Sequence, residues 1–246
     1  MKEKFRMENA AKPPTLRAIT RDSLRDGSLL AAVRSMPGLT LRTDAEMEAT
    51  LADILAARPS GAPVWVFGYG SLMWNPSFHF AERRQATLHG WQRRFCLWLR
   101  AGRGSVANPG LMLALDRGGH THGVAFRLPE GLEEEELRLV WMREMAAVGY
   151  LAQWVELDTA EGPLPAITFV ADRARDTYAE GLSDADSAAR IARATGPIGS
   201  CADYLMQTAA HLDEMGLHDE GLERIRRLVG GACLPSGMAA ELPGGG

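Results

Sequence analysis

The sequence has few cysteines, no net positive charge and no long apolar run. Its three cysteines, Cys96, Cys201 and Cys233, are widely separated and fit neither a disulfide framework nor a zinc site. A reducing cytoplasm is therefore the compartment we expect. The net charge of −4 gives no general attraction to nucleic acid or to an anionic membrane. No apolar stretch reaches the ~18 residues of a membrane span, and residues 1–6 lead into no secretion-signal core.

The composition is typical of a globular protein with one large domain, or one domain with extensions. Of 246 residues, 46% are hydrophobic and 24% are charged. A helical pattern over 44–55 is broken by Pro59, Gly61 and Pro63 before the first strong strand pattern begins. We expect three parts: a helical N-terminal extension (1–62), a central domain (63–229) and a poorly ordered tail rich in glycine and proline (230–246).

The central domain alternates short apolar runs with helical patterns. The predicted strands are 91–99, 111–116, 122–128 and 166–170, and several follow one another without a helix between them. The predicted helices are 132–147, 184–194 and 201–215. This order argues against a regular βαβ sheet. It favours an α+β fold, in which helices pack around a mixed sheet or a small barrel.

A glycine-rich strand end is the most informative local pattern. The bulky residues 64–67 predict a buried strand, which ends at Gly68 and Gly70, followed by Ser71. Glycines let the backbone turn sharply and leave its amide groups uncovered. Such amides can hold a carboxylate or a polarised carbonyl oxygen. The segment is therefore a candidate site for a small anionic substrate, if a catalytic group reaches it from elsewhere.

Two familiar glycine motifs do not fit this segment. A dinucleotide fingerprint needs a third glycine that opens a helix, whereas here Pro76 discourages a continuous helix. A serine-hydrolase elbow needs Gly-x-Ser-x-Gly, but Ser71 directly follows Gly70 and Met73 occupies the later glycine position. A plain hairpin or strand-end turn stays open as the alternative.

Glu144 is a carboxylate on an apolar helix face. If the helix continues through it, its offsets from Leu137, Val140, Trp141 and Val148 place it on the apolar stripe. There it must be paired, hydrated in a cleft, or given a raised pKa by desolvation. A structural ion pair with an arginine, or a helix that ends early and leaves Glu144 in water, are the alternatives.

Other side chains are weaker candidates. Arg93 and Arg94 should face opposite sides of a strand, so one could meet a substrate carboxylate and the other solvent. Tyr69 and Tyr204 could each supply a hydroxyl group or simply pack a ring. The histidines at 120 and 122 have no third metal ligand at a recognisable spacing, so we expect no metal site. Cys96 lies inside an apolar predicted strand, so we expect a buried packing residue and not a reactive thiol.

The segments that carry these features together resemble the ChaC-type γ-glutamylcyclotransferases, in their glutathione-specific branch. The similarity runs in family order from about residue 19 to 228 and includes Trp65–Pro76, Gly90–Cys96, Ala101–Gly104, Pro109–Gly110, Gly123–Pro129, Trp141–Met145, Gly149–Tyr150, Gly196–Gly199 and Tyr204–Leu205. Residues 19–22 resemble the N-terminal extension of bacterial members. One departure is the link 145–150, which is shorter in some members and ends there in Lys-Gly-Gly-Tyr.

The resemblance implies a compact β-barrel flanked by helices and a lyase reaction that needs no metal or organic cofactor. Members cleave glutathione to 5-oxoproline and cysteinylglycine, and the family's acid/base glutamate maps to Glu144. The strand-end loop should hold the γ-glutamyl group through Val66, Phe67, Gly68, Tyr69, Gly70, Ser71 and Leu72. Further candidates for substrate contact are Arg94, Tyr150 and Tyr204. Another γ-glutamyl substrate, or a catalytically silent binding domain, are the competing hypotheses, and the oligomeric state is left open.

Overall fold

The computed structural model describes residues 19–232, which fold around one curled sheet. The sheet has five strands in the order β2-β3-β1-β5-β4. Their bounds are β1 Trp65–Gly68, β2 Glu82–Leu99, β3 Gly110–Arg127, β4 Tyr150–Leu157 and β5 Leu164–Ala171. β1 runs antiparallel to β3 and parallel to β5, and β3 also pairs with β5 at Leu115 and Val170. This extra pairing curls the sheet into a half-barrel, so the predicted α+β fold with a barrel-like sheet is confirmed.

Two long strands replace several short predicted ones. β3 contains the predicted segment 111–116 and all but the last residue of 122–128, because β2 supplies partners on either side of the glycine pair between them. Gly118 and Gly119 of β3, with φ of +118° and +56°, form a bulge opposite Gly90 of β2, with φ of +78°. The glycines therefore bend a continuous ribbon where the sequence predicted two separate strands. β4 was not predicted at all.

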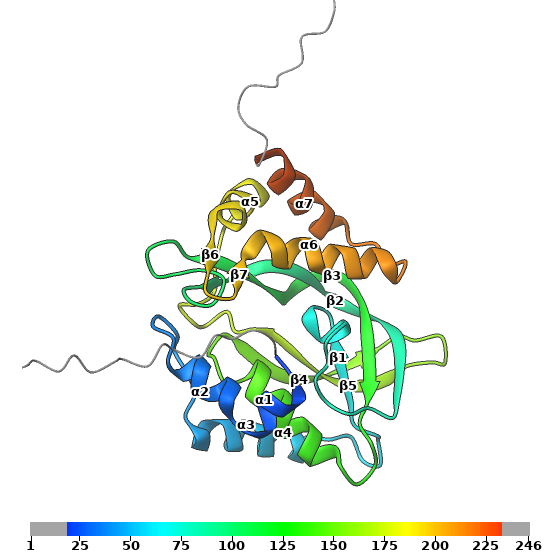
Figure 1. Ribbon diagram of the computed structural model, residues 1–246. Helices are drawn as coiled ribbons and strands as arrows, with labels where there is room; N and C mark the ends of the chain where they lie inside the picture. The colour runs from blue at the N-terminus through cyan, green and yellow to red at the C-terminus, as the bar shows by residue number, and fades with distance from the viewer. Residues whose placement is uncertain (1–18, 233–246) are drawn as a thin grey trace, which may run out of the picture.

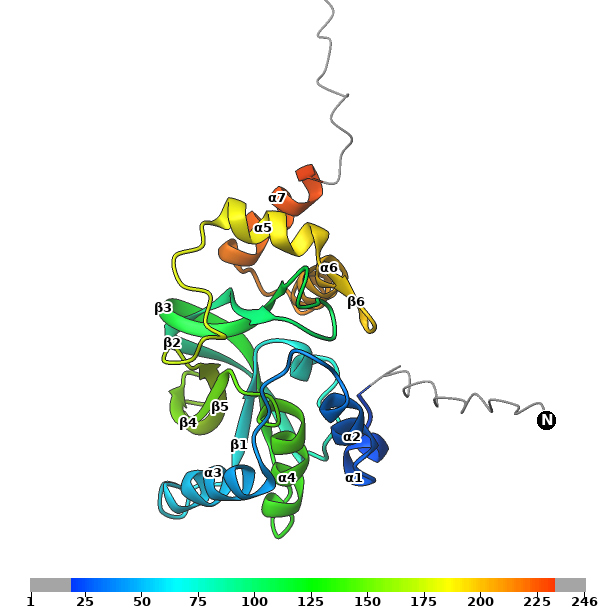
Figure 2. The same ribbon diagram turned by 90° about the vertical axis from the view of Figure 1, so that its left-hand side faces the viewer.

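The helices form two groups at opposite ends of the sheet (Figures 1 and 2). One group, beside β2 and β3, consists of α5 Asp184–Arg193, α6 Cys201–Glu214 and α7 Glu220–Ala232. The other consists of α1 Arg21–Arg25, α2 Ser28–Arg34, α3 Asp44–Ala56 and α4 Glu133–Glu144. Short elements complete the chain: the 3-10 turn η1 Ser71–Met73 and the paired strands β6 Thr195–Gly196 and β7 Gly199–Ser200. In the described residues, no helix is long and apolar enough to cross a membrane.

Most predicted helix boundaries hold within a residue, but the end of the helix predicted over 132–147 does not. α3, α5 and α6 match their predictions, and the first and last of these begin with a capping box. α7, which was not predicted, runs to Ala232 and buries Leu222, Ile225 and Val229 on one face, so it includes the first residues of the expected tail 230–246. Residues 233–246 of the expected tail, like 1–18 of the extension, lie outside the described residues.

α4 ends at Glu144, three residues earlier than predicted. Its buried Trp141 packs edge-to-face against Phe169 of β5, with ring centroids 5.5 Å apart. That contact fixes the last turn of α4 against the sheet. After Met145 the chain leaves the helix and reaches β4 at Tyr150. Glu144 therefore stands at a helix end next to the sheet, close to where β1 also ends.

Candidate active site

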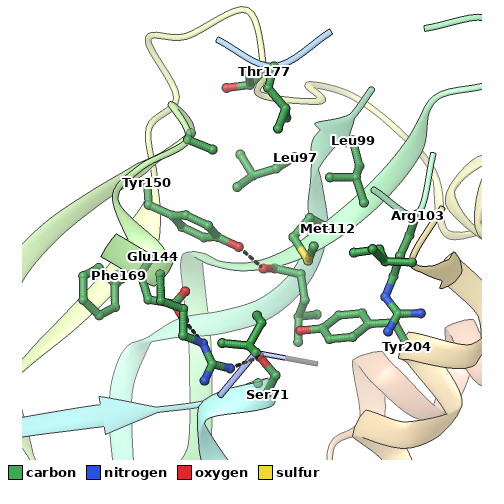
Figure 3. A pocket seen from close by; sticks show the side chains of 18 of the residues that line it. Ser71, Leu97, Leu99, Arg103, Met112, Glu144, Tyr150, Phe169, Thr177 and Tyr204 are labelled. Atoms are coloured by element: carbon green, nitrogen blue, oxygen red, sulfur yellow. Dashed lines mark hydrogen bonds and ion pairs between the residues drawn. The ribbon is translucent and has the colours of Figure 1, made fainter. Parts of the chain in front are cut away.

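A cavity of about 660 Å³ opens where β1, α4 and α6 approach one another. This volume lies in the range of small-molecule sites. Its lining includes Tyr69, Gly70, Ser71 and Leu72 from the loop after β1, and Arg143 and Glu144 from the end of α4. Tyr150 of β4 and Tyr204 of α6 line it as well (Figure 3). The structure thus brings together the predicted acid, the predicted glycine loop and both of these tyrosines.

Glu144 is partly enclosed and faces this cavity. Its side chain is 18% exposed, and Oε1 lies 3.0 Å from Nε of Arg143. Burial raises the pKa of Glu144, while the adjacent Arg143 charge and hydrogen bond act in the opposite direction. The carboxyl group therefore keeps its proton to a higher pH than an ordinary glutamate, which suits a group that must both accept and donate a proton.

Arg143 joins this acid to the glycine loop. Its side chain is 3% exposed, and Nη2 donates a hydrogen bond of 2.8 Å to Oγ of Ser71. The other terminal nitrogen donates to the backbone carbonyl of Asn75. The guanidinium group therefore ties the loop to the residue that carries the acid. In the sequence, Arg143 stood out only as part of a family motif, because its partners lie about 70 positions away.

Two tyrosines border the acid. The hydroxyl of Tyr150 donates to the carbonyl oxygen of Leu113 at 2.8 Å (Figure 3). Burial raises the pKa of Tyr150 well above its usual value and raises that of Tyr204 to about 12. Both phenols therefore stay protonated at neutral pH and can act as hydrogen-bond donors or acceptors. The long link 145–150 thus still delivers Tyr150 to the cavity.

The first half of the predicted substrate loop lies behind the cavity. Val66, Phe67 and Gly68 belong to β1 and are buried, and none of them lines the cavity. They pack the core because β1 has neighbours on both edges. Tyr69 is the first residue of the segment that lines the cavity. Its hydroxyl donates a hydrogen bond to the carbonyl of Phe169 at 2.7 Å. Of the predicted loop, only Tyr69 to Leu72 can therefore meet a substrate.

The arginine pair on β2 does face opposite sides, but neither member lines the cavity. Arg94, which was predicted to contact substrate, instead donates to Asp116 and to the carbonyl of Leu182, both at 3.1 Å. Arg93 is buried, donates from Nε to the carbonyl of Tyr69 at 2.6 Å and pairs with Asp219 at 2.8 Å. Arg93 therefore supports the loop from behind, a role that alternation along a strand cannot indicate.

Further residues line the cavity that the sequence did not single out. Arg100, Arg103 and Asp203 bring charge to the lining, and Figure 3 shows Arg103 beside Tyr204 on the side away from Glu144. Residues of the N-terminal extension, Ile19 and 38–40, also contribute to the lining. No local pattern marks these positions as functional, because their role depends on chain segments that meet only in the fold. Among residues 19–232, no cluster of three or more histidine, cysteine or acidic side chains suits a metal ion.

Comparisons with known proteins point to one family. The family model described as "ChaC-like protein" matches residues 64–232. A glutathione-specific γ-glutamylcyclotransferase from Escherichia coli (strain K12) is 45% identical over 83% of this chain and 89% of its own length. A glutathione-specific γ-glutamylcyclotransferase 1 from Mus musculus is 34% identical over 76% of this chain and 89% of its own.

A solved structure supports the fold alone. The crystal structure of a γ-glutamyl cyclotransferase specific to glutathione from yeast aligns with a TM-score of 0.63 at 23% sequence identity. The alignment covers 70% of this chain and 99% of the yeast chain. The family model spans most of the sequence, and the Escherichia coli relative covers 83% of it at 45% identity, so this chain belongs to the ChaC-like family.

Proposed function

We propose that this protein is a glutathione-specific γ-glutamylcyclotransferase, a lyase that cleaves glutathione to 5-oxoproline and cysteinylglycine with Glu144 as its acid/base group. The relatives named for this activity match the chain over most of its length. One structural observation carries the mechanism: Glu144, with its raised pKa, shares a cavity with the glycine loop, and Arg143 bridges the two.

The reaction is an internal displacement in the γ-glutamyl group. The α-amine nitrogen bonds to the γ-carbonyl carbon and closes a five-membered lactam, while the bond from that carbon to the cysteine nitrogen breaks. Two protons leave the α-ammonium nitrogen, which keeps one hydrogen in the lactam, and two arrive on the departing nitrogen, which becomes the ammonium group of cysteinylglycine. Atoms and charges therefore balance without a co-reactant. Holding the substrate in a folded conformer is therefore the main task of the site.

Glu144 serves proton transfer in both directions. As a carboxylate it takes a proton from the α-ammonium group, and as a carboxylic acid it returns one to the leaving nitrogen. Its raised pKa brings it closer to the pKa of an amine than an ordinary glutamate would be. General acid/base assistance of this kind contributes roughly 10²–10⁴ in rate.

The loop from Tyr69 to Leu72 supplies the polar contacts for the γ-glutamyl group. Ser71 opens the turn η1, and the first N–H groups of a helical turn have no partner within it. These N–H groups and the Ser71 hydroxyl can bind a carboxylate or the oxyanion that forms on the γ-carbonyl. In this role Ser71 binds substrate and is not a nucleophile, so no acyl-enzyme forms.

Product identification tests the proposal directly. Purified protein and reduced glutathione should give equimolar 5-oxoproline and cysteinylglycine without added metal. Release of free glutamate in place of 5-oxoproline would show hydrolysis and refute cyclisation. The Glu144→Gln variant keeps the size of the side chain but cannot titrate. Unchanged turnover in that variant would remove Glu144 from the mechanism and would favour a different acid/base group.

Substrate choice needs a separate measurement. A panel of γ-glutamyl amines and γ-glutamyl amino acids should give kcat/KM values well below that for glutathione, and comparable values would contradict glutathione specificity. No turnover of any member would favour the silent binding domain. The substrate is the one partner that the proposal requires. A cytoplasmic location, where disulfides are rare and thiols stay reduced, remains our expectation from the cysteine pattern.

A further inference from the structure

The N-terminal extension forms one wall of the cavity although it lies outside the region matched by the family model. The match begins at residue 64, whereas Ile19, Gly38, Leu39 and Thr40 line the cavity. Figure 2 shows the segment between α2 and α3 passing beside the end of α4. The contact is specific: Leu41 forms an antiparallel bridge with Ala147, in the link that follows the catalytic helix.

Backbone hydrogen bonds fix this segment to the link on both sides of that bridge. The N–H of Arg42 donates to the carbonyl of Ala146 at 2.9 Å. The N–H of Val148 donates to the carbonyl of Thr40 at 2.8 Å. The link after Glu144 is thereby hydrogen-bonded, in the manner of antiparallel strands, to residues 40–42, about 105 positions earlier. This is the link whose length departs from the shorter form seen in some family members.

The side chain of Arg42 reinforces the same link. The residue is only 9% exposed, and its guanidinium group donates to three backbone carbonyls. Nη1 donates to Met145 at 2.7 Å and to Ala147 at 2.9 Å, and Nη2 donates to Tyr150 at 2.7 Å. These acceptors begin one residue after Glu144 and end at the tyrosine that borders it. A cation at a helix C-terminus is also favoured by the helix dipole.

A second contact reaches the residue that pairs with Glu144. The carbonyl of Ile19 accepts hydrogen bonds from the Asn75 side chain at 2.9 Å and from the Ser77 hydroxyl at 3.1 Å. Arg143 donates to the backbone carbonyl of Asn75 and lies within 3.4 Å of the Ser77 hydroxyl. The extension therefore reaches the surroundings of Glu144 at two points, through Arg42 and through the carbonyl of Ile19. Arg42 makes three hydrogen bonds there and Ile19 accepts two.

We infer that Arg42 is a positioning residue for the reaction: its three hydrogen bonds hold the chain after α4 so that Glu144 and Tyr150 keep their places in the cavity. Arg42 touches no reacting atom in this assignment and acts through Glu144. The inference rests on the proposed function, because it concerns the acid/base role of that glutamate. It also gives the N-terminal extension a role in the reaction, through the position of Glu144.

Arg42→Met tests the inference, since it keeps the apolar stem and removes every donor. We expect kcat to fall roughly 10²-fold, the order of loss that a small misplacement of a catalytic group causes. KM should change by less than about threefold, because the lost interaction matters mainly in the transition state. Arg42→Lys keeps the charge and can reach only part of the three acceptors, so its kcat should lie between those of the wild type and Arg42→Met.

Arg58→Met is the matched control. Arg58 also lies in the extension and also donates to a backbone carbonyl, that of Ala62 at 2.8 Å, but it does not line the cavity. Its kcat should equal that of the wild type. Circular dichroism at the assay temperature measures the folded fraction of each variant, and kcat is expressed per folded molecule. If Arg42→Met does not fold, Arg42→Lys decides.

The outcomes separate the two claims. A kcat that falls at least tenfold per folded molecule, with Arg58→Met unchanged, supports the positioning role. An unchanged kcat in folded Arg42 variants, a rise in KM alone, or a loss that only follows the unfolded fraction would overturn it. Wild-type protein that forms no 5-oxoproline would instead refute the proposed function, and that result appears before any variant is compared.

Discussion

Gly70 lies against the hydroxyl group of Tyr204, so that a Cβ atom added at Gly70 would stand 3.0 Å from that oxygen. This contact connects the loop after β1 with α6 across the cavity. The close approach of this side chain favours a glycine at position 70. The width of the cavity at this point therefore depends on the absence of one methyl group.

Gly70→Ala should lower kcat/KM by about tenfold, because the tyrosine ring or the loop must shift by a few tenths of an ångström and the substrate site shifts with it. Steady-state kinetics with glutathione measures the effect. The loss of stability should stay below about 1.5 kcal/mol, since a phenol at a cavity edge has room to move.

Tyr204→Phe provides the control for this contact. It removes the oxygen that the new methyl group would meet, so Gly70→Ala should cost less in the Tyr204→Phe background than in the wild type. Equal losses in both backgrounds would show that the methyl group acts through something other than Tyr204. Gly230→Ala is the control for a glycine-to-alanine change in itself. Gly230 lies at an open position on α7, so this variant should leave kcat/KM unchanged.

A second prediction concerns the titration of Glu144. Burial raises its pKa in the folded protein, against the opposing effect of Arg143. Because the carboxylate is the base form, wild-type kcat should rise with pH through a pKa above that of an ordinary glutamate. Glu144→Gln should lower kcat roughly 10²–10⁴-fold and remove this limb from the pH profile. A limb at the ordinary carboxylic pKa would contradict the effect of burial.

The same pKa shift has a consequence for stability, and its sign is fixed. The folded state binds the Glu144 proton more tightly than the unfolded state does. The group therefore favours the fold most below its unfolded pKa, and that contribution is lost as pH rises through the raised folded pKa. Glu144→Gln should accordingly be more stable than the wild type at pH 8, and the gain should shrink toward pH 4. Urea unfolding at both pH values measures it.

The sequence predicted those parts of the site that depend on local pattern. Glu144 could be found because its neighbours on one helix are apolar, and the loop at Gly70 because glycines follow a strand. Alternation on β2 correctly placed Arg93 and Arg94 on opposite faces. It could not tell which face meets the cavity, and in the fold neither does. That information depends on how the sheet curls, which pairings between β1, β3 and β5 decide.

The rest of the site is built from distant pairs, which leave no local trace. Arg42 meets its acceptors more than 100 positions away, and an arginine before a predicted helix looks like surface charge. β4 escaped prediction because its residues are mostly half-buried and show no clean alternation. The long β2–β3 ribbon was divided because bulged glycines resemble turn glycines in sequence. Where the fold depends on contacts between residues far apart in the sequence, periodicity could not predict it.

Arg103 gives a third prediction. It lines the cavity beyond Tyr204, with its guanidinium carbon 5.7 Å from the centre of that ring, and one nitrogen donates to the carbonyl of Ser200 at 2.9 Å. A substrate whose γ-glutamyl end lies at Ser71 would direct its glycine carboxylate to this side. Arg103→Met should therefore raise KM for glutathione roughly tenfold and change kcat little, since the bond exists before and during reaction.

Esterified glutathione sharpens this test. Blocking the glycine carboxylate removes the charge that Arg103 would bind, so the wild type should show a raised KM for the ester. Arg103→Met should treat glutathione and its ester alike, because the interaction is already absent. If the variant still prefers glutathione by the wild-type ratio, Arg103 does not contact that carboxylate.

A fourth prediction concerns Asp116, which is buried outside the cavity and explains what Arg94 does. The residue is 1% exposed, and it accepts hydrogen bonds from Arg173 at 2.7 Å, Tyr178 at 2.9 Å and Arg94 at 3.1 Å. Asp116→Asn keeps the shape but replaces an acceptor oxygen by a donor group that faces other donors. Unfolding in urea should show a loss of about 1–3 kcal/mol at pH 7, while kcat/KM of the folded protein stays unchanged.

The pH dependence of that loss separates an ion network from simple packing. Burial alone would raise the pKa of Asp116, but the bonds from Arg173, Tyr178 and Arg94 outweigh it and the pKa is lowered. A lowered pKa stabilises the fold above the unfolded pKa, and this contribution disappears as pH falls through the folded pKa. The difference in the free energy of unfolding between wild type and Asp116→Asn should therefore shrink in acid.

The exposed pair of Asp213 and Arg226 offers a control, because Asp213→Asn should change stability by less than about 0.5 kcal/mol at either pH. A loss at Asp116 that is the same at pH 7 and in acid would mean that shape, and not charge, is what this cluster contributes.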